Sequence, residues 1–312
     1  MELRQLAAFQ EVARCASFSQ AAVRLGYVQS SVSAQVQALE RELDTRLFDR
    51  LGRRVVLTAA GSALLAHADR MLQLADEARH AVASTRAADG ELVGSIAISA
   101  PESLLTYRLP PLLSRFRARC PRVDIAIRPT AVGRLRPEVR RAVNEGSVDI
   151  AFVLDAPLEI AGLMIEHLEP EPISLIAPPN HRLAGRRMVA PRDLAGEALL
   201  LPEAPDQGCA YRRQFEQQLG RVGVSPGETL EFASIEAVKQ CVIAGMGLSV
   251  LPEVAVRSEA DAGKLVILPW SASFSVDMQM VWHAKRWRSP AMTAFLGTAR
   301  ETFRTPTVAP AA

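Results

Sequence analysis

Residues 17–58 decide the fold, and they read SFSQAAVRLGYVQSSVSAQVQALERELDTRLFDRLGRRVVLT. Ser17 followed by Gln20 is a capping-box pattern, which predicts that a helix begins here. Gly26 stands where the glycine that follows a helix end is expected, so this first helix is predicted to be short. The chain must then turn within a few residues before a second helical pattern begins.

The second helix of this stretch is predicted to run from about residue 29 to residue 43. Its apolar residues recur at the spacing of one buried helix face. They are Val32, Val36, Leu39 and Leu43. The opposite face is small and polar, as a surface lying close to DNA bases would be. Two short helices joined by a tight turn are typical of a helix-turn-helix, although many proteins that bind no DNA also contain two such helices.

A basic hairpin is predicted to follow the second helix. Within residues 46–54 only Asp49 is acidic, against the arginines Arg46, Arg50, Arg53 and Arg54. A glycine turn at residue 52 then leads into the β-prone run at 55–57. A basic two-stranded wing beside a recognition helix can reach phosphates or the minor groove, where arginine is favoured. The wing therefore favours DNA binding over the general reading of two amphipathic helices.

Residues 1–60 resemble the winged helix-turn-helix of the LysR-type transcriptional regulators. The matching stretches are MELRQLAAF (1–9), SFSQAAVRL (17–25), QSSVSAQVQALE (29–40), LFDR (47–50) and RRVVLTAAG (53–61). The resemblance implies sequence-specific binding of operator DNA. The residues expected to face base edges are Gln29, Ser30, Ser33 and Gln37, and those expected at the backbone or minor groove are Arg50, Arg53 and Arg54. Family members often carry a basic or polar side chain where this chain has Ala34, so no base contact is expected there.

Composition limits the remaining possibilities. With 312 residues and 49% hydrophobic side chains, the chain is long enough for two or three domains with their own cores. The net charge is only +2, so the basic character is local to the wing. No apolar run reaches the ~18 residues of a membrane span, and the N-terminus does not resemble a secretory signal, so a cytoplasmic protein is expected. The 4 cysteines are far apart, which indicates neither a disulfide framework nor a zinc site.

A long helix is predicted after the wing, from a Thr58 cap to about Arg86. Its apolar residues alternate at steps of four and three, as in the seam of a coiled coil. They are Leu64, Ala68, Met71, Ala75, Ala78 and Val82. The same periodicity fits a helix that packs on its own domain, but the resemblance favours a linker helix that pairs two subunits. Residues 87–90 then break the helix and are a candidate hinge.

From residue 92 onward strands and helices alternate, which indicates parallel βαβ units. The predicted strands are 94–99, 123–128, 148–154, 173–177, 198–201, one near 230, 247–251, 265–268 and 276–282. The predicted helices are 105–119, 134–146, 208–219, 234–244 (capped by Ser234) and 289–303, and the tail 305–312 is expected to be disordered.

The predicted fold class is α+α/β, in which a winged helix-turn-helix (1–60) is followed by a linker helix and hinge (61–90). A two-lobed α/β effector domain that resembles periplasmic binding proteins then occupies residues 91–304. Its first lobe is expected at about 91–162 and 266–304, and its second at about 163–265. Open α/β sheets bind ligands beyond the carboxyl ends of their strands, so an effector is expected between the lobes.

Residues at strand ends and helix starts are the candidates for this effector site. They are Ser99, Glu102, Ser103, Thr130, Pro202, Ala204, Ser234 and Gly247. Ser103 could also cap the following helix. A helix N-terminus facing the cleft would suit a carboxylate ligand, because its free N–H groups and dipole favour anions. Each of these residues could instead be an ordinary loop residue in contact with solvent.

The chain carries no pattern that supports catalysis. Its histidines lack zinc-ligand spacing, and neither a dinucleotide fingerprint nor a nucleophile elbow is present. Cys209 lies at a predicted helix start beside the cleft, where it could be a redox-sensing thiol or a structural or pocket-lining residue. We therefore expect no enzyme, metal or cofactor.

The expected partners are operator DNA, RNA polymerase, a small effector such as an organic acid or amino acid, and further copies of the chain forming a homodimer or homotetramer. The effector is expected to favour one arrangement of the lobes and so to change DNA bending. Two other classes stay open. A solute-binding receptor would bind the ligand without DNA, and an architectural protein would bind DNA without regard to sequence or metabolite.

Overall fold

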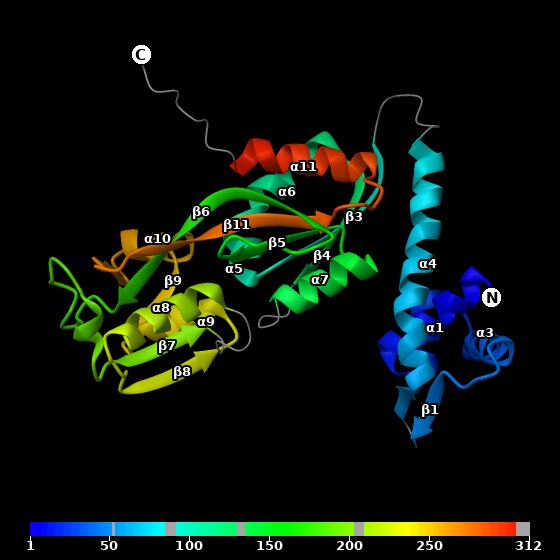
Figure 1. Cartoon of the computed structure of the whole chain (residues 1–312), viewed down its shortest axis with the longest axis horizontal. Coiled ribbons are helices and arrows are strands. Elements are labelled where there is room, and N and C mark those ends of the chain that lie inside the picture. Colours follow the sequence, from blue (N-terminus) through cyan, green and yellow to red (C-terminus); the bar gives the residue numbers. More distant parts are fainter. Residues whose placement is uncertain (52–53, 85–91, 130–134, 203–208, 304–312) are drawn as a thin grey trace, which may run out of the picture. The chain divides into compact units, whose positions relative to one another are not determined.

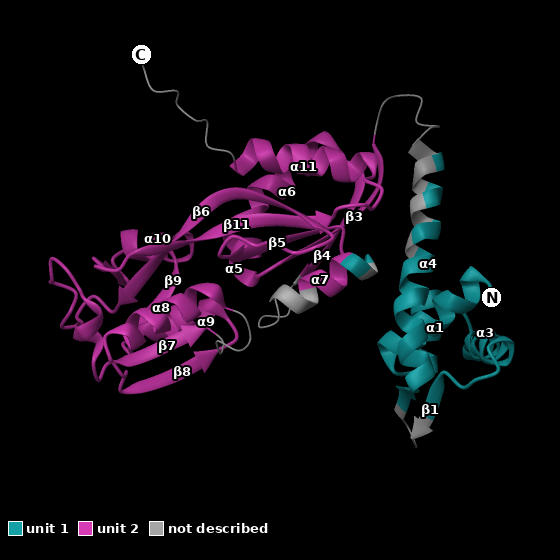
Figure 2. Cartoon of the chain, in the orientation of Figure 1, with its two compact units in different colours: residues 1–89, 144–147 teal, residues 90–143, 148–312 magenta. Residues whose placement is uncertain are grey.

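The computed structural model describes residues 1–51, 54–84, 92–129, 135–202 and 209–303 (Figure 1). The chain divides into two compact units, which are coloured in Figure 2. The N-terminal unit comprises residues 1–89 with 144–147, and the C-terminal unit comprises residues 90–143 with 148–312. In the described part of the chain no helix is long and apolar enough to cross a membrane.

The N-terminal unit has the predicted order of helices and hairpin. Its elements are α1 (Leu3–Cys15), α2 (Phe18–Leu25), α3 (Gln29–Glu42), β1 (Phe48–Leu51), β2 (Arg54–Leu57) and α4 (Ala59–Ser84). The Ser17 side chain accepts a hydrogen bond from the Gln20 N–H, and Gly26 follows α2 with a φ of 69°. Thr58 caps α4 by accepting the Gly61 N–H at 3.0 Å. The predicted helix starts at Ser17 and Thr58 are thus confirmed.

The core of this unit forms where α1, α2, α3 and the base of α4 meet. Phe9 is fully buried at its centre, and its ring lies 5.3 Å from that of Phe48. Val32, Val36 and Leu39 of α3 are buried as predicted. Leu43 was expected on the same buried stripe but is 38% exposed, because α3 ends at Glu42 and Leu43 is its C-cap.

The C-terminal unit is built on a 7-stranded sheet of order β10-β6-β11-β5-β3-β4, with β9 also paired to β6. These strands are β3 (Val93–Ala100), β4 (Arg122–Pro129), β5 (Ile150–Asp155), β6 (Leu163–Ala177), β9 (Ser249–Pro252), β10 (Val266–Leu268) and β11 (Phe274–His283). β3 is parallel to β4 and to β5, as the βαβ pattern predicted. β11 is instead antiparallel to both β5 and β6, so the sheet is mixed.

A separate parallel pair, β7 (Ala198–Pro202) and β8 (Glu228–Phe232), belongs to the second lobe. The helices of this unit are α5 (Glu102–Tyr107), α6 (Leu109–Arg119), α7 (Leu135–Glu145), α8 (Ala210–Arg221), α9 (Ile235–Ile243), α10 (Glu253–Asp261) and α11 (Pro290–Phe303), with the short 3-10 helix η1 at Pro191–Leu194. The single helix predicted at 105–119 is two helices, because the chain breaks at Arg108.

The long strands β6 and β11 connect the two lobes. β6 pairs with β11 along most of its length, and its C-terminal end also pairs with β9 and β10. The strand predicted at 265–268 is β10, which pairs with the C-terminal end of β6. The strands β6 and β11 thus run through the sheet from the part predicted as the first lobe to the part predicted as the second.

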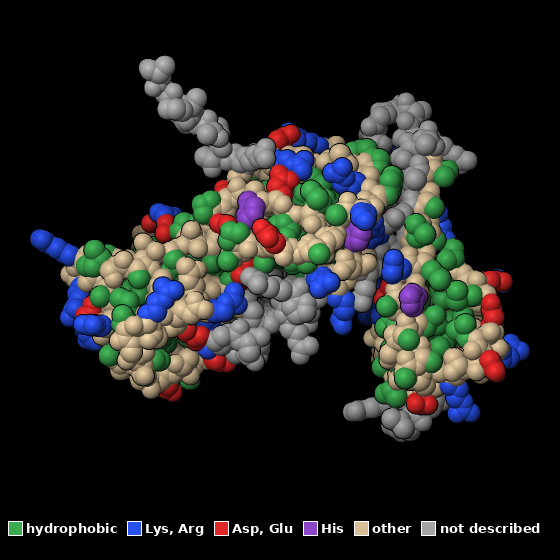
Figure 3. Space-filling model, viewed as in Figure 1, with side chains coloured by type: hydrophobic (Ala, Val, Ile, Leu, Met, Phe, Trp, Pro, Cys, Tyr) green, Lys and Arg blue, Asp and Glu red, His purple; other side chains and the backbone are tan. Residues whose placement is uncertain are grey.

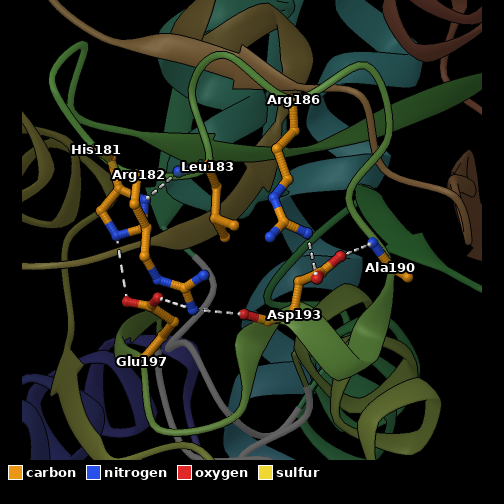
Figure 4. A network of polar contacts seen from close by, with 7 residues as sticks. All are labelled: His181, Arg182, Leu183, Arg186, Ala190, Asp193 and Glu197. Atoms are coloured by element: carbon orange, nitrogen blue, oxygen red, sulfur yellow. Dashed lines mark hydrogen bonds and ion pairs between the residues drawn. The ribbon is translucent and has the colours of Figure 1, made fainter.

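A network of hydrogen bonds and ion pairs stabilises the segment between β6 and β7 (Figure 4). His181 and Arg182 both bind the Glu197 carboxylate. Asp193 accepts the Ala190 N–H at 2.8 Å and the Arg186 guanidinium at 2.5 Å. The Ala190 hydrogen bond is the main cause that lowers the pKa of Asp193, and Arg186 adds to it. The network orders the segment that leads into β7.

Candidate DNA-binding surface and effector cavity

The N-terminal half of α3 presents polar side chains outside the core. Gln29, Ser30 and Gln37 are exposed, and Ser33 is half-buried. Their positions follow from the burial of Val32 and Val36 on the opposite face of the same helix. The helix thus has the form of a recognition helix, with one apolar face in the core and one short polar face outside it.

Gln29, the first residue of α3, is held by the preceding helix. The Ser19 hydroxyl on α2 donates a hydrogen bond to Oε1 of Gln29 at 2.9 Å. A glutamine amide has two donor hydrogens on its nitrogen and two acceptor lone pairs on its oxygen. The contact with Ser19 uses one of these lone pairs, so the amide is oriented while its Nε2 end can still donate to DNA.

The wing predicted from the arginine-rich stretch is the antiparallel pair β1–β2. Its register places Arg50 opposite Val55 and Leu51 opposite Arg54. Arg50 and Arg54 therefore lie on the two strands at the end of the hairpin next to the turn. Arg53 lies outside the described residues.

Some residues of the seam predicted for α4 lie in the core of the N-terminal unit, and others lie on its surface. Met71, Ala78 and Val82 are exposed, and Ala75 is half-buried. Ala68, expected on the seam, is fully buried in the core of its own unit, where α4 packs on α1, and Leu64 packs against the same core. Leu74, which the sequence reading missed, is 66% exposed on the side of Met71 and Ala78. The available apolar stripe is thus Met71, Leu74, Ala78 and Val82.

In the C-terminal unit a cavity lies between the start of α5 and the elements β7, α8 and α9. Its volume is small, about 40 Å³ when measured as the space that the centre of a water molecule can reach. Its lining is mainly apolar and consists of Pro101, Glu102, Ser103, Leu154, Pro202, Cys209, Ala210, Tyr211, Ala233 and Ile235. A cavity of this size holds water but no metabolite, so a larger ligand requires the first-lobe and second-lobe walls to separate.

The structure brings several of the predicted effector residues together. Glu102, Ser103 and Pro202 line the cavity, and Ser234 contacts Glu102. Ser99 is buried in β3 and is absent from this lining, while Thr130 and Ala204 lie outside the described residues. Ser103 does not cap α5, because Pro101 precedes that helix and Ser103 is already within it.

Gly247 is explained by packing rather than by the cavity. A Cβ atom at this position would lie 2.5 Å from the Ala198 carbonyl oxygen, closer than real side chains come. The close approach lets Leu248 and Ala198 form a backbone hydrogen bond at 2.9 Å. Gly247 thus permits β7 to pack beside Leu248, the residue that precedes β9.

The Glu102 side chain connects the start of α5 with the start of α9. Its Oε1 accepts the Ser234 hydroxyl at 3.0 Å, and its Oε2 accepts the Ile235 N–H at 3.1 Å. Ser234 is also the N-cap of α9 and accepts the Ala237 N–H at 3.4 Å. Glu102 therefore lies at the anion-binding end of α9, where N–H groups and the helix dipole favour a negative charge.

Two further residues after Glu102 bind the second lobe. The Tyr107 hydroxyl lies 3.0 Å from Nζ of the buried Lys239. Arg108 pairs with the buried Glu171 at 2.6 Å, and burial raises the pKa of Glu171 although Arg108 opposes the shift. Burial alone would lower the pKa of Lys239, but hydrogen bonds with Glu259 and Glu236 raise it overall. Helix α5 and its C-cap thus make polar contacts with α9 and β6 through Glu102, Tyr107 and Arg108.

Leu154 and Tyr211 line the cavity but were not among the effector residues predicted from the sequence. Leu154 was expected at the end of a buried strand. Cys209 and Tyr211 were expected at a helix start beside the cleft, with Cys209 as a structural or pocket-lining residue or as a redox-sensing thiol. Both places lie where α/β folds bind ligands, which is the signal that could have identified these residues.

A second, more polar hollow of about 290 Å³ lies between the end of β5 and α8. It includes Asp155, Arg213 and Arg221, and Asp155 is buried and paired with Arg213 at 3.2 Å. On the face shown in Figure 3, Lys and Arg side chains are interspersed with Asp and Glu.

Comparisons with known proteins match both parts of the chain. Residues 3–62 match the model of the bacterial regulatory helix-turn-helix protein, lysR family, and residues 89–304 match the LysR substrate binding domain. The regulator YwqM of Bacillus subtilis is 38% identical over 97% of this chain and 100% of its own length. The regulator CbbR of Rhodospirillum rubrum is 33% identical over 96% of this chain and 97% of its own.

Solved structures share the whole fold. Full-length CbnR in complex with its target DNA has a TM-score of 0.70 at 22% identity, covering 97% of this chain and 100% of that one. A full-length OxyR variant from Pseudomonas aeruginosa has a TM-score of 0.71 at 24% identity, covering 99% of this chain and 96% of that one.

Proposed function

The chain belongs to the LysR family of bacterial transcriptional regulators, and on this basis we propose which of its residues read DNA and which bind the effector. It is a DNA-binding regulator with a C-terminal effector-binding domain, and its relatives are regulators rather than enzymes. Gln29, Ser30, Ser33 and Gln37 read base edges, and Arg50, Arg53 and Arg54 contact phosphates or the minor groove.

The observation that carries the DNA-reading proposal is the polar face at the start of α3. This face is exposed, free of large apolar side chains, and begins with a glutamine whose amide is already oriented by Ser19. Glutamine and serine are side chains that hydrogen-bond base edges in the major groove. A wing with arginines on both strands supplies charge for the phosphates beside it.

We assign dimerisation to the exposed stripe of α4. Met71, Leu74, Ala78 and Val82 recur at helical spacing and leave apolar surface uncovered within the chain. A second copy that covers this stripe would hold two recognition helices at a constant separation, as binding to two half-sites requires. A tetramer would add a second such pair.

The cavity beside α5 is our proposed effector site. It is bounded by both lobes, and Glu102 connects its two walls. A ligand that separates these walls would favour a second arrangement of the lobes and thereby change DNA bending or contacts with RNA polymerase. From the sequence we expected an organic acid or an amino acid, with its carboxylate at a helix N-terminus. The position of Glu102 at α9 weighs against an organic acid bound in that way.

The assignment is tested by a gel shift with DNA from beside the protein's own gene, with random competitor and with fractions of a small-metabolite extract. We expect a specific shift whose position or affinity changes with one fraction, and we expect Gln29→Ala to lose specificity. A shift that random DNA removes equally would contradict specific reading. A specific shift that no fraction alters would contradict the effector role of the cavity.

A further inference from the structure

The contacts of Glu102 restrict the chemistry of the effector. From them we infer that the cavity beside α5 takes an uncharged or positively charged, mainly apolar molecule, and that it disfavours carboxylates. The inference rests on the proposed role of this cavity as the effector site.

The N-terminal end of α9 already binds a carboxylate of the chain itself. The first turn of a helix offers N–H groups that bind an anion, and here the Glu102 carboxylate receives the Ile235 N–H and the Ser234 hydroxyl. Ser234 in turn accepts the Ala237 N–H. Groups that would otherwise receive a ligand carboxylate are thus already bonded within the chain.

The described wall of the cavity is mainly apolar and contains the carboxylate of Glu102. Among the described residues that line the cavity, Glu102 is the one charged side chain, and most of the others are apolar. The arginines close in sequence to the lining residues have carboxylate partners outside the lining: Arg108 pairs with Glu169 and Glu171, Arg212 with Glu216 and Glu231, and Arg213 with Asp155. A ligand carboxylate would therefore meet a negative charge in an apolar surrounding, and like charges at short distance repel strongly there.

The same wall can attract a hydrogen-bond donor joined to an apolar group. Each carboxylate oxygen can accept more than one hydrogen bond, so Glu102 can bind α9 and still accept a donor from the ligand. Tyr211 and Leu154 supply aromatic and aliphatic surface on the same wall. An amine attached to an apolar body satisfies both features, as does an uncharged apolar molecule with a hydrogen-bond donor.

Benzoate and benzylamine are matched probes, because they share a ring and have opposite charges at neutral pH. Their affinities for the full chain are measured by calorimetry at constant ionic strength, with the wild type and with Glu102→Ala, which vacates the end of α9. We expect Glu102→Ala to bind benzoate at least about fivefold more tightly than the wild type, and benzylamine more weakly. Equal benzoate affinity in the two proteins, including no binding by either, would overturn the inference.

Two controls separate this effect from others. Glu301→Ala removes an exposed carboxylate that pairs with Arg119 on the same unit, and it is expected to leave both affinities unchanged. Arg221→Ala tests anion binding in the second hollow, and benzoate binding that disappears with this substitution would not belong to the cavity. If Glu102→Ala does not fold, Glu102→Gln removes the charge while retaining an acceptor, and the same gain in benzoate affinity is expected.

DNA binding is followed in the same proteins. A gain of benzoate affinity in Glu102→Ala together with unchanged DNA binding in all conditions would support the role of Glu102 and contradict the cavity as the effector site. Failure of the proposed function is thus distinguished from failure of the inference.

Discussion

The Ser19 hydroxyl donates to Gln29 Oε1 at 2.9 Å and so joins α2 to the first residue of the recognition helix. The contact orients the amide, and in the proposed binding of Gln29 to a base edge this would reduce the entropy lost. We therefore expect Ser19 to act through Gln29 as a positioning residue.

Replacing Ser19 by Ala should therefore weaken discrimination between operator and random DNA by about 1 kcal/mol, the typical value of one hydrogen bond. Gln29→Ala should cost roughly 1–3 kcal/mol of discrimination. Anisotropy titrations on both DNAs measure this. In the Gln29→Ala background, Ser19→Ala should have no additional effect, and an equal loss in both backgrounds would contradict the positioning role. Ser95→Ala, an exposed serine of the C-terminal unit, is the control.

The wing arginines should act without regard to sequence. Arg53→Ala is expected to weaken binding to operator and random DNA alike and to flatten the salt dependence by about one unit of slope, because one phosphate contact is lost. Titrations at several salt concentrations measure the slope. Arg119→Ala, on the C-terminal unit, should leave it unchanged. A loss confined to the operator would indicate base reading by Arg53 instead.

The exposed stripe of α4 should hold two copies together. Leu74→Glu places a charge on a side chain that is 66% exposed in one chain and buried in the proposed pair. We expect light scattering to show a lower molar mass for this variant at a concentration where the wild type is dimeric or larger. Ser62→Glu adds the same charge on another exposed face of α4 and should keep the wild-type mass. An unchanged mass for Leu74→Glu would place the interface elsewhere.

The network around Asp193 predicts a pH dependence of stability. Its folded pKa is lowered from 3.8, first by the Ala190 hydrogen bond and then by Arg186. A lowered pKa means that the ionised carboxylate stabilises the fold above about pH 3.8 and that this contribution is lost as the pH falls through the folded value. Asp193→Asn should lower the midpoint temperature of thermal unfolding at pH 7. The difference in this temperature between the variant and the wild type should become smaller in acid. A constant difference from pH 7 to pH 3 would contradict this.

The local elements of the N-terminal unit followed from the sequence because their signals are local. Ser17 and Thr58 cap helices within three residues of their own positions, and the buried face of α3 follows from its period. Ala68 was misplaced because the same period fits a seam and a core. Only the packing of α4 on α1 decides between them.

The C-terminal unit was harder to predict because its organisation depends on distant contacts. The antiparallel course of β11 beside β5 joins residues more than a hundred positions apart, and no spacing in the sequence encodes it. Ser234 was recognised as a cap, yet its second partner, Glu102, lies 132 residues away. The sequence therefore indicated an anion-binding helix end but could not show that the chain itself provides the anion.

The most direct test of the account is recovery of genomic DNA. Purified protein is mixed with sheared DNA from its own source, and the bound fragments are sequenced with wild type and Gln29→Ala in parallel. We predict that wild type enriches a small set of fragments sharing two related half-sites, and that Gln29→Ala loses this enrichment while still binding DNA. Uniform recovery of the genome by wild type would contradict sequence-specific regulation and favour an architectural role.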